Sequence, residues 1–331
     1  MNLKDQVLGI LEKNRGRTIS GTKMANQFSV TRSAIWKVIK TLEKDGYNIK
    51  AVTNKGYCLM DNNDIISAES IIPYLKGEAI NFDLDVRQKV TSTNAIVKDM
   101  ANQGEKEGKV VIASEQTEGR GRMGRKFYSP NDTGIYFTIL LRPKLNLEDS
   151  LLITTTAAVA VAEAIEKVAP VKAEIKWVND IFVDKKKVCG ILTEASIDLE
   201  SAGLKYAVLG IGINITTNIF PDEISLSAGS IFNEKPKDRP ITSILVAEIL
   251  NNLSLYMNSF DDKSHIAKYR DRSFLLGKEI LVIKENDKIP ALAIDIDDKA
   301  RLVVEYQDKT RESLSSGEVS IREKENKSRY E

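Results

Sequence analysis

The first sixty residues constrain the fold of this chain more than any other segment. Three stretches repeat apolar residues at helical spacing, and two short strand-like segments follow them. The second stretch begins near Ser20, and Thr31 is placed to cap the third stretch, which ends before Gly46. The two strands meet at a turn around residues 54–56. The order helix, helix, turn, helix, hairpin predicts a winged helix-turn-helix domain over residues 1–62.

The same segment is strongly basic. Residues 1–60 hold eleven lysines and arginines against four acidic residues, while the whole chain has 48 basic and 47 acidic residues. A basic block on a mildly acidic body is typical of an attached nucleic-acid-binding module. In a winged helix-turn-helix, the start of the third helix meets base edges and the wing contacts phosphates. The residues that we expect to contact DNA are Thr31, Arg32, Ser33, Trp36, Lys37 and Lys55.

Composition disfavours membrane proteins and metal-centred folds. No stretch approaches the roughly 18 consecutive apolar residues of a membrane span, and the charged start MNLKDQ lacks the apolar core of a secretory signal. We therefore expect a soluble, cytoplasmic protein. The two cysteines, Cys58 and Cys189, and the single histidine, His265, are too few for a disulfide framework, a zinc site or a histidine-based triad. We expect two reduced, buried thiols, a solvated His265 and no metal site of the protein's own.

The middle of the chain alternates strand-like and helix-like segments, which predicts an α/β or α+β domain over residues 68–272. Helices are expected at 151–168 and 241–260. Between them we expect strands near EIKWVNDIFV and KVCGILTEAS, with a turn at residues 184–186, and a further strand at KYAVLGIGINI. Short alternating segments after this domain, GKEILVI, ALAIDID and RLVVEY, predict a small SH3-like β barrel over residues 275–322, and the polar tail 323–331 is expected to be disordered.

The segment EQTEGRGRMGRKFYSP is the most distinctive local sequence. Three glycines, Gly119, Gly121 and Gly124, alternate with arginines. Glycine lets backbone N–H groups approach an anion closely, and guanidinium groups form planar forks that match phosphate and carboxylate. The pattern predicts a polyanion-binding loop, although it matches neither GxxxxGK[ST] nor a GxGxxG that follows a strand. By composition alone, a basic loop that contacts nucleic acid nonspecifically is an equal alternative.

Three further segments carry polar residues in suggestive places. TSTNAI sets Ser92, Thr93 and Asn94 at the end of a strand and the start of a helix, KWVND sets Lys176, Asn179 and Asp180 near a strand, and Lys187 follows on the return strand. Each is weak alone, because such residues more often cap helices, form turns or stay solvated. In this order, STN, EQTxGRGRxGRxxxSP, KWxND, KxxGILTE and GIGIN resemble the biotin protein ligases. With both flanking domains, the chain resembles the bifunctional type that is also the biotin-operon repressor.

The resemblance covers nearly all of the chain and implies its chemistry. Such proteins join biotin to ATP, with Mg²⁺, to form biotinyl-5′-adenylate, and then transfer biotin to a lysine of a biotin carboxyl carrier protein. The implied catalytic residues are Lys187, Arg122, Arg120 and Asp180. The implied biotin-binding residues are Ser92, Thr93, Asn94, Gln116, Arg120, Gly121, Arg122, Lys187 and Gly190. The implied nucleotide-binding residues are Arg122, Arg125, Asn179, Lys187, Asn214 and Arg322.

One departure and several alternatives remain. Val178 stands where the family has proline; valine suits a strand, so we expect the strand to survive, with the placement of Asn179 in doubt. The resemblance implies operator DNA as a partner and a homodimer on DNA when the adenylate is bound. A lipoate-type ligase, a metabolite-sensing repressor without ligase activity, and a ligase whose first domain only packs or dimerises are the alternatives. The polar cluster at Ser92, the presence of Lys187 and Arg122, and the basic first domain weigh against them.

Overall fold

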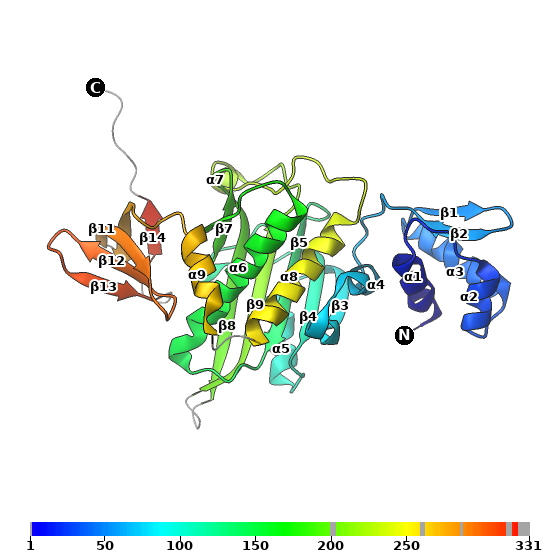
Figure 1. Cartoon of the computed structure of the whole chain (residues 1–331), viewed down its shortest axis with the longest axis horizontal. Coiled ribbons are helices and arrows are strands. Elements are labelled where there is room, and N and C mark those ends of the chain that lie inside the picture. Colours follow the sequence, from blue (N-terminus) through cyan, green and yellow to red (C-terminus); the bar gives the residue numbers. More distant parts are fainter. Residues whose placement is uncertain (1, 199–202, 259–261, 285–286, 316–319, 324–331) are drawn as a thin grey trace. The chain divides into compact units, whose positions relative to one another are not determined.

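The computed structural model forms two compact units (Figure 1). The first comprises Met1–Ile80 and Glu234–Asn251, and the second comprises Asn81–Asn233 and Asn252–Glu331. The residues described by the structure are 2–198, 203–258, 262–284, 287–315 and 320–323.

The first unit contains the predicted winged helix-turn-helix. Its elements are α1 (Leu3–Lys13), α2 (Gly21–Gln27), α3 (Arg32–Lys44), β1 (Ile49–Val52) and β2 (Gly56–Leu59). The Thr31 hydroxyl accepts from the Ala34 N–H at 3.2 Å and caps α3, as expected from the sequence. The two strands pair antiparallel to form the wing. Apolar residues at helical spacing on all three helices meet in one core that includes Val7, Met24 and Ile39, each fully buried.

The segment after the wing is fastened to the start of a long helix, α8 (Ile241–Asn258). Asp64 accepts from the Thr242 N–H at 3.0 Å and from the Thr242 hydroxyl at 2.7 Å, which satisfies orphan groups at the helix start. The hydroxyls of Ser70, in α4 (Ala68–Ile71), and Ser243 lie 2.7 Å apart. These bonds explain why the first part of α8 belongs to the first unit.

A seven-stranded mixed sheet, in the order β3-β4-β5-β9-β8-β7-β6, forms the centre of the second unit. Its strands are β3 (Asp83–Val90), β4 (Lys109–Gln116), β5 (Gly134–Leu141), β6 (Glu174–Lys176), β7 (Asp180–Val183), β8 (Lys186–Asp198) and β9 (Gly203–Asn214). Only β3 and β4 pair parallel; every other pair is antiparallel. Helix α5 (Thr93–Asn102) packs on β4, β5 and β9, and α6 (Ser150–Val168) packs on β6 to β9. The α+β fold expected from the sequence is confirmed.

The prediction of one continuous strand near EIKWVNDIFV is wrong. Residues 174–176 and 180–183 form separate strands that pair with each other, with Lys176 opposite Asp180. Val178 therefore lies in a tight turn, after a cis Trp177–Val178 peptide bond, and not in a strand. Both Trp177 and Val178 are buried. The apolar pattern of this turn could not be told from that of a strand, because the turn packs inside the protein and carries no polar turn residues until Asn179.

The small β domain predicted near the carboxyl end is present as an antiparallel sheet, and the structure gives its strand order as β13-β12-β11-β10-β14. Its strands are β10 (Glu279–Lys284), β11 (Asp287–Ile296), β12 (Leu302–Tyr306), β13 (Arg311–Leu314) and β14 (Ser320–Glu323). Arg322 pairs through its backbone with Leu281, and its side chain lies outside what the structure describes. The tail expected to be disordered comprises residues 323–331; Glu323 is instead the last residue of β14, and residues 324–331 lie outside the described residues.

The sequence prediction for His265 is wrong. This residue lies in α9 (Ser264–Arg272), which packs against α6, and it is 1 % exposed instead of solvated. Burial lowers its pKa to about 4; Asp262 opposes this shift and Lys263 adds to it. The two thiols are buried and free, as expected. Among the described residues, no helix is long and apolar enough to cross a membrane.

His265 predicts a pH dependence of stability. The unfolded chain takes up a proton near the ordinary histidine pKa of 6.5, whereas the folded chain does so near 4, so the unfolded state is favoured as pH falls through this window. We expect the free energy of unfolding to fall by about 3 kcal/mol from this residue between pH 7 and pH 4. Urea denaturation of the wild type and of His265→Gln at both pH values measures it, and equal losses in the two proteins would contradict the assignment.

Candidate active site

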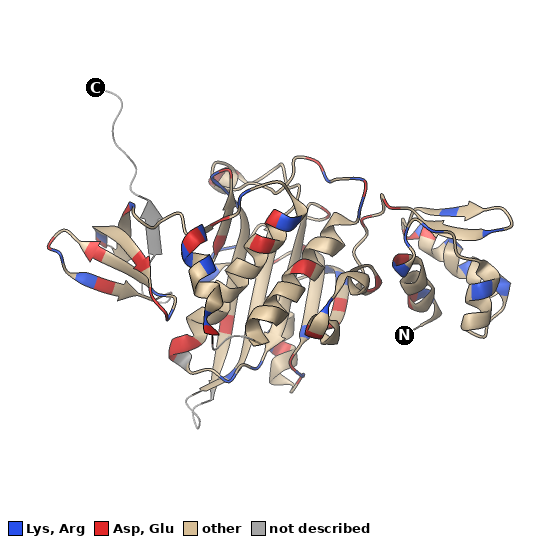
Figure 2. Cartoon of the chain, viewed as in Figure 1, with Lys and Arg blue, Asp and Glu red and all other residues tan. Residues whose placement is uncertain are grey.

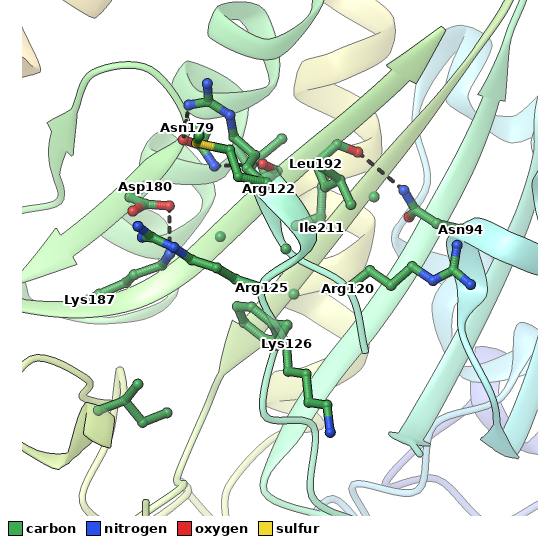
Figure 3. A pocket seen from close by; sticks show the side chains of 18 of the residues that line it. Asn94, Arg120, Arg122, Arg125, Lys126, Asn179, Asp180, Lys187, Leu192 and Ile211 are labelled. Carbon is green, nitrogen blue, oxygen red and sulfur yellow. Dashed lines mark hydrogen bonds and ion pairs between the residues drawn. The ribbon is translucent and has the colours of Figure 1, made fainter. Parts of the chain in front are cut away.

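A pocket of about 370 Å³ opens over β8 and β9 in the second unit (Figure 3). The start of α5, the glycine-arginine loop and the turn between β6 and β7 complete its wall. The residues predicted from separate motifs line this one pocket: Ser92, Thr93, Asn94, Gln116, Arg120, Gly121, Arg122, Arg125, Asn179, Asp180, Lys187 and Gly190. Segments up to about 100 residues apart in the chain therefore form a single candidate site.

One end of the pocket is a hydrogen-bonded polar cluster. Gln116 Oε1 accepts from the backbone N–H of Thr93 at 2.9 Å, and Gln116 Nε2 donates to Ser129 Oγ at 3.1 Å. Thr138 Oγ1 lies 2.8 Å from Thr93 Oγ1 and 2.7 Å from Asn94 Oδ1. These bonds fix the amide and hydroxyl groups before any ligand arrives, which suits a ligand that both donates and accepts hydrogen bonds.

Asn94 is held by further hydrogen bonds, and it occupies space that is free because residue 210 is a glycine. Its Nδ2 donates to Glu194 Oε2 at 3.0 Å, and Lys98 pairs with the other oxygen of Glu194 at 3.1 Å. Burial raises the pKa of the Glu194 carboxyl, but the bonds from Asn94 and Lys98 outweigh burial and lower it overall. A Cβ on Gly210 would lie 1.9 Å from Asn94 Oδ1. Glycine at this position of β9 is therefore a steric requirement of the polar cluster.

The other end of the pocket holds fixed positive charge. Arg122 donates to Asn179 Oδ1 at 3.1 Å, and Lys187 Nζ pairs with Asp180 Oδ1 at 2.7 Å (Figure 3). Burial lowers the pKa of the Arg122 guanidinium, and Asp180 opposes that shift. The charged residues that line the pocket are the cations Arg120, Arg122, Arg125, Lys126, Lys176 and Lys187 and one acid, Asp180. An excess of positive charge around a closed space favours a ligand that carries several negative charges.

The glycine-arginine loop is folded back on itself. Gly121 N donates to Arg125 O at 2.7 Å, and Phe127 N donates to Gly119 O at 2.9 Å. At the tip, Met123 has a φ of 54° and is 78 % exposed. The backbone thus turns both Arg120 and Arg122 toward the pocket wall (Figure 3).

An apolar wall joins the two ends, and the sequence analysis missed its main residue. The ring of Phe127 packs so closely on the sheet that a Cβ would lie 2.6 Å from it at Gly212 and 3.0 Å from it at Gly190. Leu192 and Ile211 line the same wall. The alternation of glycine and isoleucine in GIGIN was the available signal, because glycines on one face of a strand leave room for a ring from another segment.

Two predicted residues are not among those that line the pocket. Asn214 is buried at the end of β9, where its Nδ2 donates to Gly229 O at 3.0 Å. Gly229 N in turn donates to Lys187 O at 2.9 Å. Asn214 therefore supports the backbone of Lys187 indirectly, through Gly229, and does not line the pocket itself. The side chain of Arg322, as stated above, lies outside the described residues.

The candidate DNA surface lies on α3 and the wing of the first unit. Arg32, Trp36 and Lys37 are exposed on α3, with Trp36 51 % exposed. Lysine and arginine are visible on α3 and along the wing in Figure 2. The Thr31 hydroxyl, which caps α3, also lies 2.9 Å from Ser33 Oγ. The two predicted hydroxyl groups therefore bond within the helix start, and they are exposed like the cations and the indole.

Comparison with known proteins decides the family. Family models match at three places: "HTH domain" at residues 4–58, "Biotin/lipoate A/B protein ligase family" at 86–214 and "Biotin protein ligase C terminal domain" at 275–322. The bifunctional ligase/repressor BirA of Bacillus subtilis is 36 % identical over 231 residues, which cover 69 % of this chain and 70 % of that protein. The chain belongs to the biotin protein ligase family.

Other relatives of this ligase family extend the match. The bifunctional ligase/repressor BirA of Escherichia coli is 25 % identical over 310 residues, 93 % of this chain and 94 % of that protein. The biotin protein ligase of Aquifex aeolicus, solved in complex with biotin and ATP, superposes with a TM-score of 0.62 at 28 % identity, covering 73 % of this chain and 99 % of that one. The family resemblance inferred from the motifs is confirmed.

Gly210→Ala tests the steric requirement in this ligase fold. The added methyl would displace Asn94 and break its contacts with Thr138 and Glu194, so we expect a loss of about 1–3 kcal/mol in the free energy of unfolding. Gly9→Ala, in α1, is the control, because its Cβ meets no heavy atom closer than 3.8 Å and alanine favours a helix. Chemical denaturation measures both. A Gly210→Ala protein as stable as the wild type would show that Asn94 is not held by this approach.

Proposed function

We propose that the chain is an ATP-dependent biotin protein ligase that forms biotinyl-5′-AMP and transfers biotin to a lysine of a biotin carboxyl carrier protein. One observation carries the proposal: in a single pocket, the polar cluster at Asn94 and the pair of Lys187 and Asp180 lie on opposite sides of an apolar wall, with Arg120 beside the polar cluster (Figure 3). Biotin has a polar ureido ring, an apolar chain and a carboxylate in the same order. ATP supplies the further negative charge that the cations require.

The polar cluster favours biotin over lipoate. The ring of lipoate offers no ureido group, so the amide and hydroxyl groups of Thr93, Asn94 and Gln116 would be left without ligand partners. A site built for hydrogen bonds discriminates strongly against a ligand that lacks them. The alternative of a sensor without ligase activity is disfavoured because Arg122 and Lys187, which chemistry requires and simple sensing does not, both line the pocket.

In the first step, an oxygen of the biotin carboxylate attacks the α-phosphorus of ATP, and the bond to the pyrophosphate oxygen breaks. Two anions must approach each other, so the barrier falls where fixed cations offset the charge. We assign this task to Arg120, Arg122 and Lys187. Asp180 pairs with Lys187 at 2.7 Å and holds that ammonium in place, while the other N–H groups of Lys187 donate to the carboxylate and phosphate oxygens. The glycine-arginine loop covers the adenylate and protects it from water.

In the second step, the carrier lysine attacks the acyl carbon, forms the amide and releases AMP. Asp180 is the acidic residue among those that line the pocket, so it is the group that could orient the incoming amine. The described residues hold no cluster of three acidic, histidine or cysteine side chains fit for a metal ion. Among the residues that line the pocket, Asp180 and Asn179 offer the oxygen atoms that would hold a Mg²⁺ ion brought by the phosphates of ATP. When bound it offsets phosphate charge.

ATP-dependent release of pyrophosphate on addition of biotin tests the ligase activity. We expect release with biotin and none with lipoate. Lys187→Ala and Arg122→Ala should each lose about 10²-fold or more in rate, because each removes a cation from the reacting groups. Lys144→Ala, a charge change at an exposed residue outside the pocket, is the control and should match the wild type. No release from the wild type with either acid would overturn the proposal.

We further propose that the first domain binds operator DNA as a homodimer when the adenylate is bound, and that the protein acts in the cytoplasm. Support comes from the exposed Arg32, Trp36 and Lys37 on α3 and from the basic charge of this domain. A twofold dimer matches a palindromic operator whose half-sites are spaced by whole helical turns. Two relatives are named bifunctional ligase/repressor, and the alignment with one of them covers 93 % of this chain.

Gel shifts test the repressor function with Arg32→Ala and Lys37→Ala. Each variant should bind the chain's own promoter region about tenfold or more weakly, because each removes a cation from the groove-facing start of α3. Lys44→Ala removes the same charge from the last turn of α3 and should bind like the wild type. Affinity should rise when biotin and ATP are present. Equal affinity with and without them would contradict the coupling, and equal affinity of all variants would remove α3 from the interface.

A further inference from the structure

One side chain of the pocket wall, that of Trp177, forms a hydrogen bond with the C-terminal domain. Trp177 lines the pocket and is 6 % exposed. Its indole Nε1 donates to the carbonyl oxygen of Ala300 at 2.9 Å, across 123 residues of sequence. A buried indole N–H needs an acceptor, and here it comes from the turn between β11 and β12 (Figure 1). The pocket wall and the C-terminal domain are thus joined by a directional bond.

The turn that presents this carbonyl is itself tightly held. Ala300 N donates to Asp297 O at 2.8 Å, and Asp297 N donates to Arg301 O at 2.9 Å. The carboxylate of Asp297 accepts from the backbone N–H groups of Lys299 and Arg301, both at 2.9 Å, and from Arg301 Nε at 2.8 Å. Ala300 is 1 % exposed. Asp297 therefore fixes the position of the carbonyl that Trp177 binds.

Helix α9 holds the next residue from the same side. The Tyr269 hydroxyl donates to Val178 O at 3.0 Å, and Tyr269 is fully buried. The neighbouring Arg270 pairs with Asp298 of the β11–β12 turn at 3.0 Å. Trp177 and Val178 are thus held from outside the pocket by α9 and the C-terminal domain together.

The two residues that follow hold the cations of the pocket. Asn179 accepts from Arg122 at 3.1 Å and donates to Ile191 O at 2.8 Å. Asp180 pairs with Lys187 at 2.7 Å. Four consecutive residues therefore connect an anchor outside the pocket with two cations inside it. A small displacement of such a turn would move both cations, and misplacement by about 1 Å can cost about 10²-fold in rate.

We propose that Trp177 is a positioning residue for adenylation, and that the C-terminal domain takes part in the reaction through it. The bond to Ala300 sets the turn from which Asn179 and Asp180 place Arg122 and Lys187. The inference rests on the proposed ligase function. In this inference the C-terminal domain affects the chemical step indirectly, because the backbone carbonyl of Ala300 fixes Trp177.

Three variants test the inference. Trp177→Phe removes the N–H donor and keeps a ring, Asp297→Ala loosens the acceptor turn without touching the pocket, and the third protein carries both changes. Asp308→Ala is the matched control: in the next turn of the same domain, Asp308 likewise accepts from a backbone N–H, that of Thr310, at 3.0 Å. The measurement is biotin-dependent release of pyrophosphate by the full chain, with kcat and the KM for biotin determined for each protein after its folding is verified by thermal unfolding.

We expect each single variant to lower kcat by about tenfold or more while the KM for biotin changes by less than about twofold, because the polar cluster lies on other elements. The double variant should be no slower than the slower single variant, since both changes break one connection. Asp308→Ala should match the wild type. Multiplying losses in the double variant, a rise in KM with kcat unchanged, or an active Asp297→Ala would overturn the inference. An inactive wild type would instead overturn the proposed function, and this inference with it.

If Trp177→Phe fails to fold, Asp297→Ala still decides, because it leaves Trp177 intact. Loss of kcat at unchanged KM in that variant supports the connection, whereas wild-type kcat contradicts it.

Discussion

Mutual repulsion between the cations of the pocket is the constraint on which the rest of the site depends. Six basic side chains and one acidic side chain line a space of about 370 Å³. Arg120, Arg125 and Lys126 are exposed to water, whereas the half-buried cations Arg122 and Lys187 are costly to place without a fixed partner. Asn179 and Asp180 provide two of these partners. The short turn between β6 and β7 therefore contacts two cations of the pocket on one side and buried residues of the surrounding fold on the other.

The polar end of the pocket is built by the opposite means. There, uncharged side chains satisfy each other, and the bonds run from Ser129 through Gln116 and Thr93 to Thr138 and Asn94. Such a network is stable only when every member has a hydrogen-bond partner, so few arrangements of the surrounding strands can satisfy all of its members. Gln116 lies at the end of β4 and Thr138 lies on β5, whereas β8 and β9 carry Lys187, Leu192 and Ile211; all four strands belong to one sheet. A rigid sheet keeps the two ends of the ligand site at a constant separation.

The sequence predicted a large part of this structure, for physical reasons that differ between segments. The winged helix-turn-helix followed from local signals, namely the caps at Ser20 and Thr31 and the apolar periodicity between them. The pocket residues followed from the order of the motifs, because their resemblance to the biotin protein ligases implied those residues, whereas each motif alone had a common alternative interpretation. The turn at Trp177 and the burial of His265 could not be predicted, because both result from packing against segments about 100 residues away in sequence. Phe127 was missed because its place in the wall depends on Gly190 and Gly212 in other strands.

The contact between Phe127 and these glycines has a consequence for the range of ligands. At Gly190 and Gly212 the sheet already carries the smallest possible side chains, so no substitution at these two positions can create more room. Next to these glycines, space for a bulkier analogue of the acid has to come from Phe127, by shortening its side chain or lengthening the loop that carries it. Engineering a ligase of this type to accept enlarged labels therefore starts with that surface loop, before any change to the sheet.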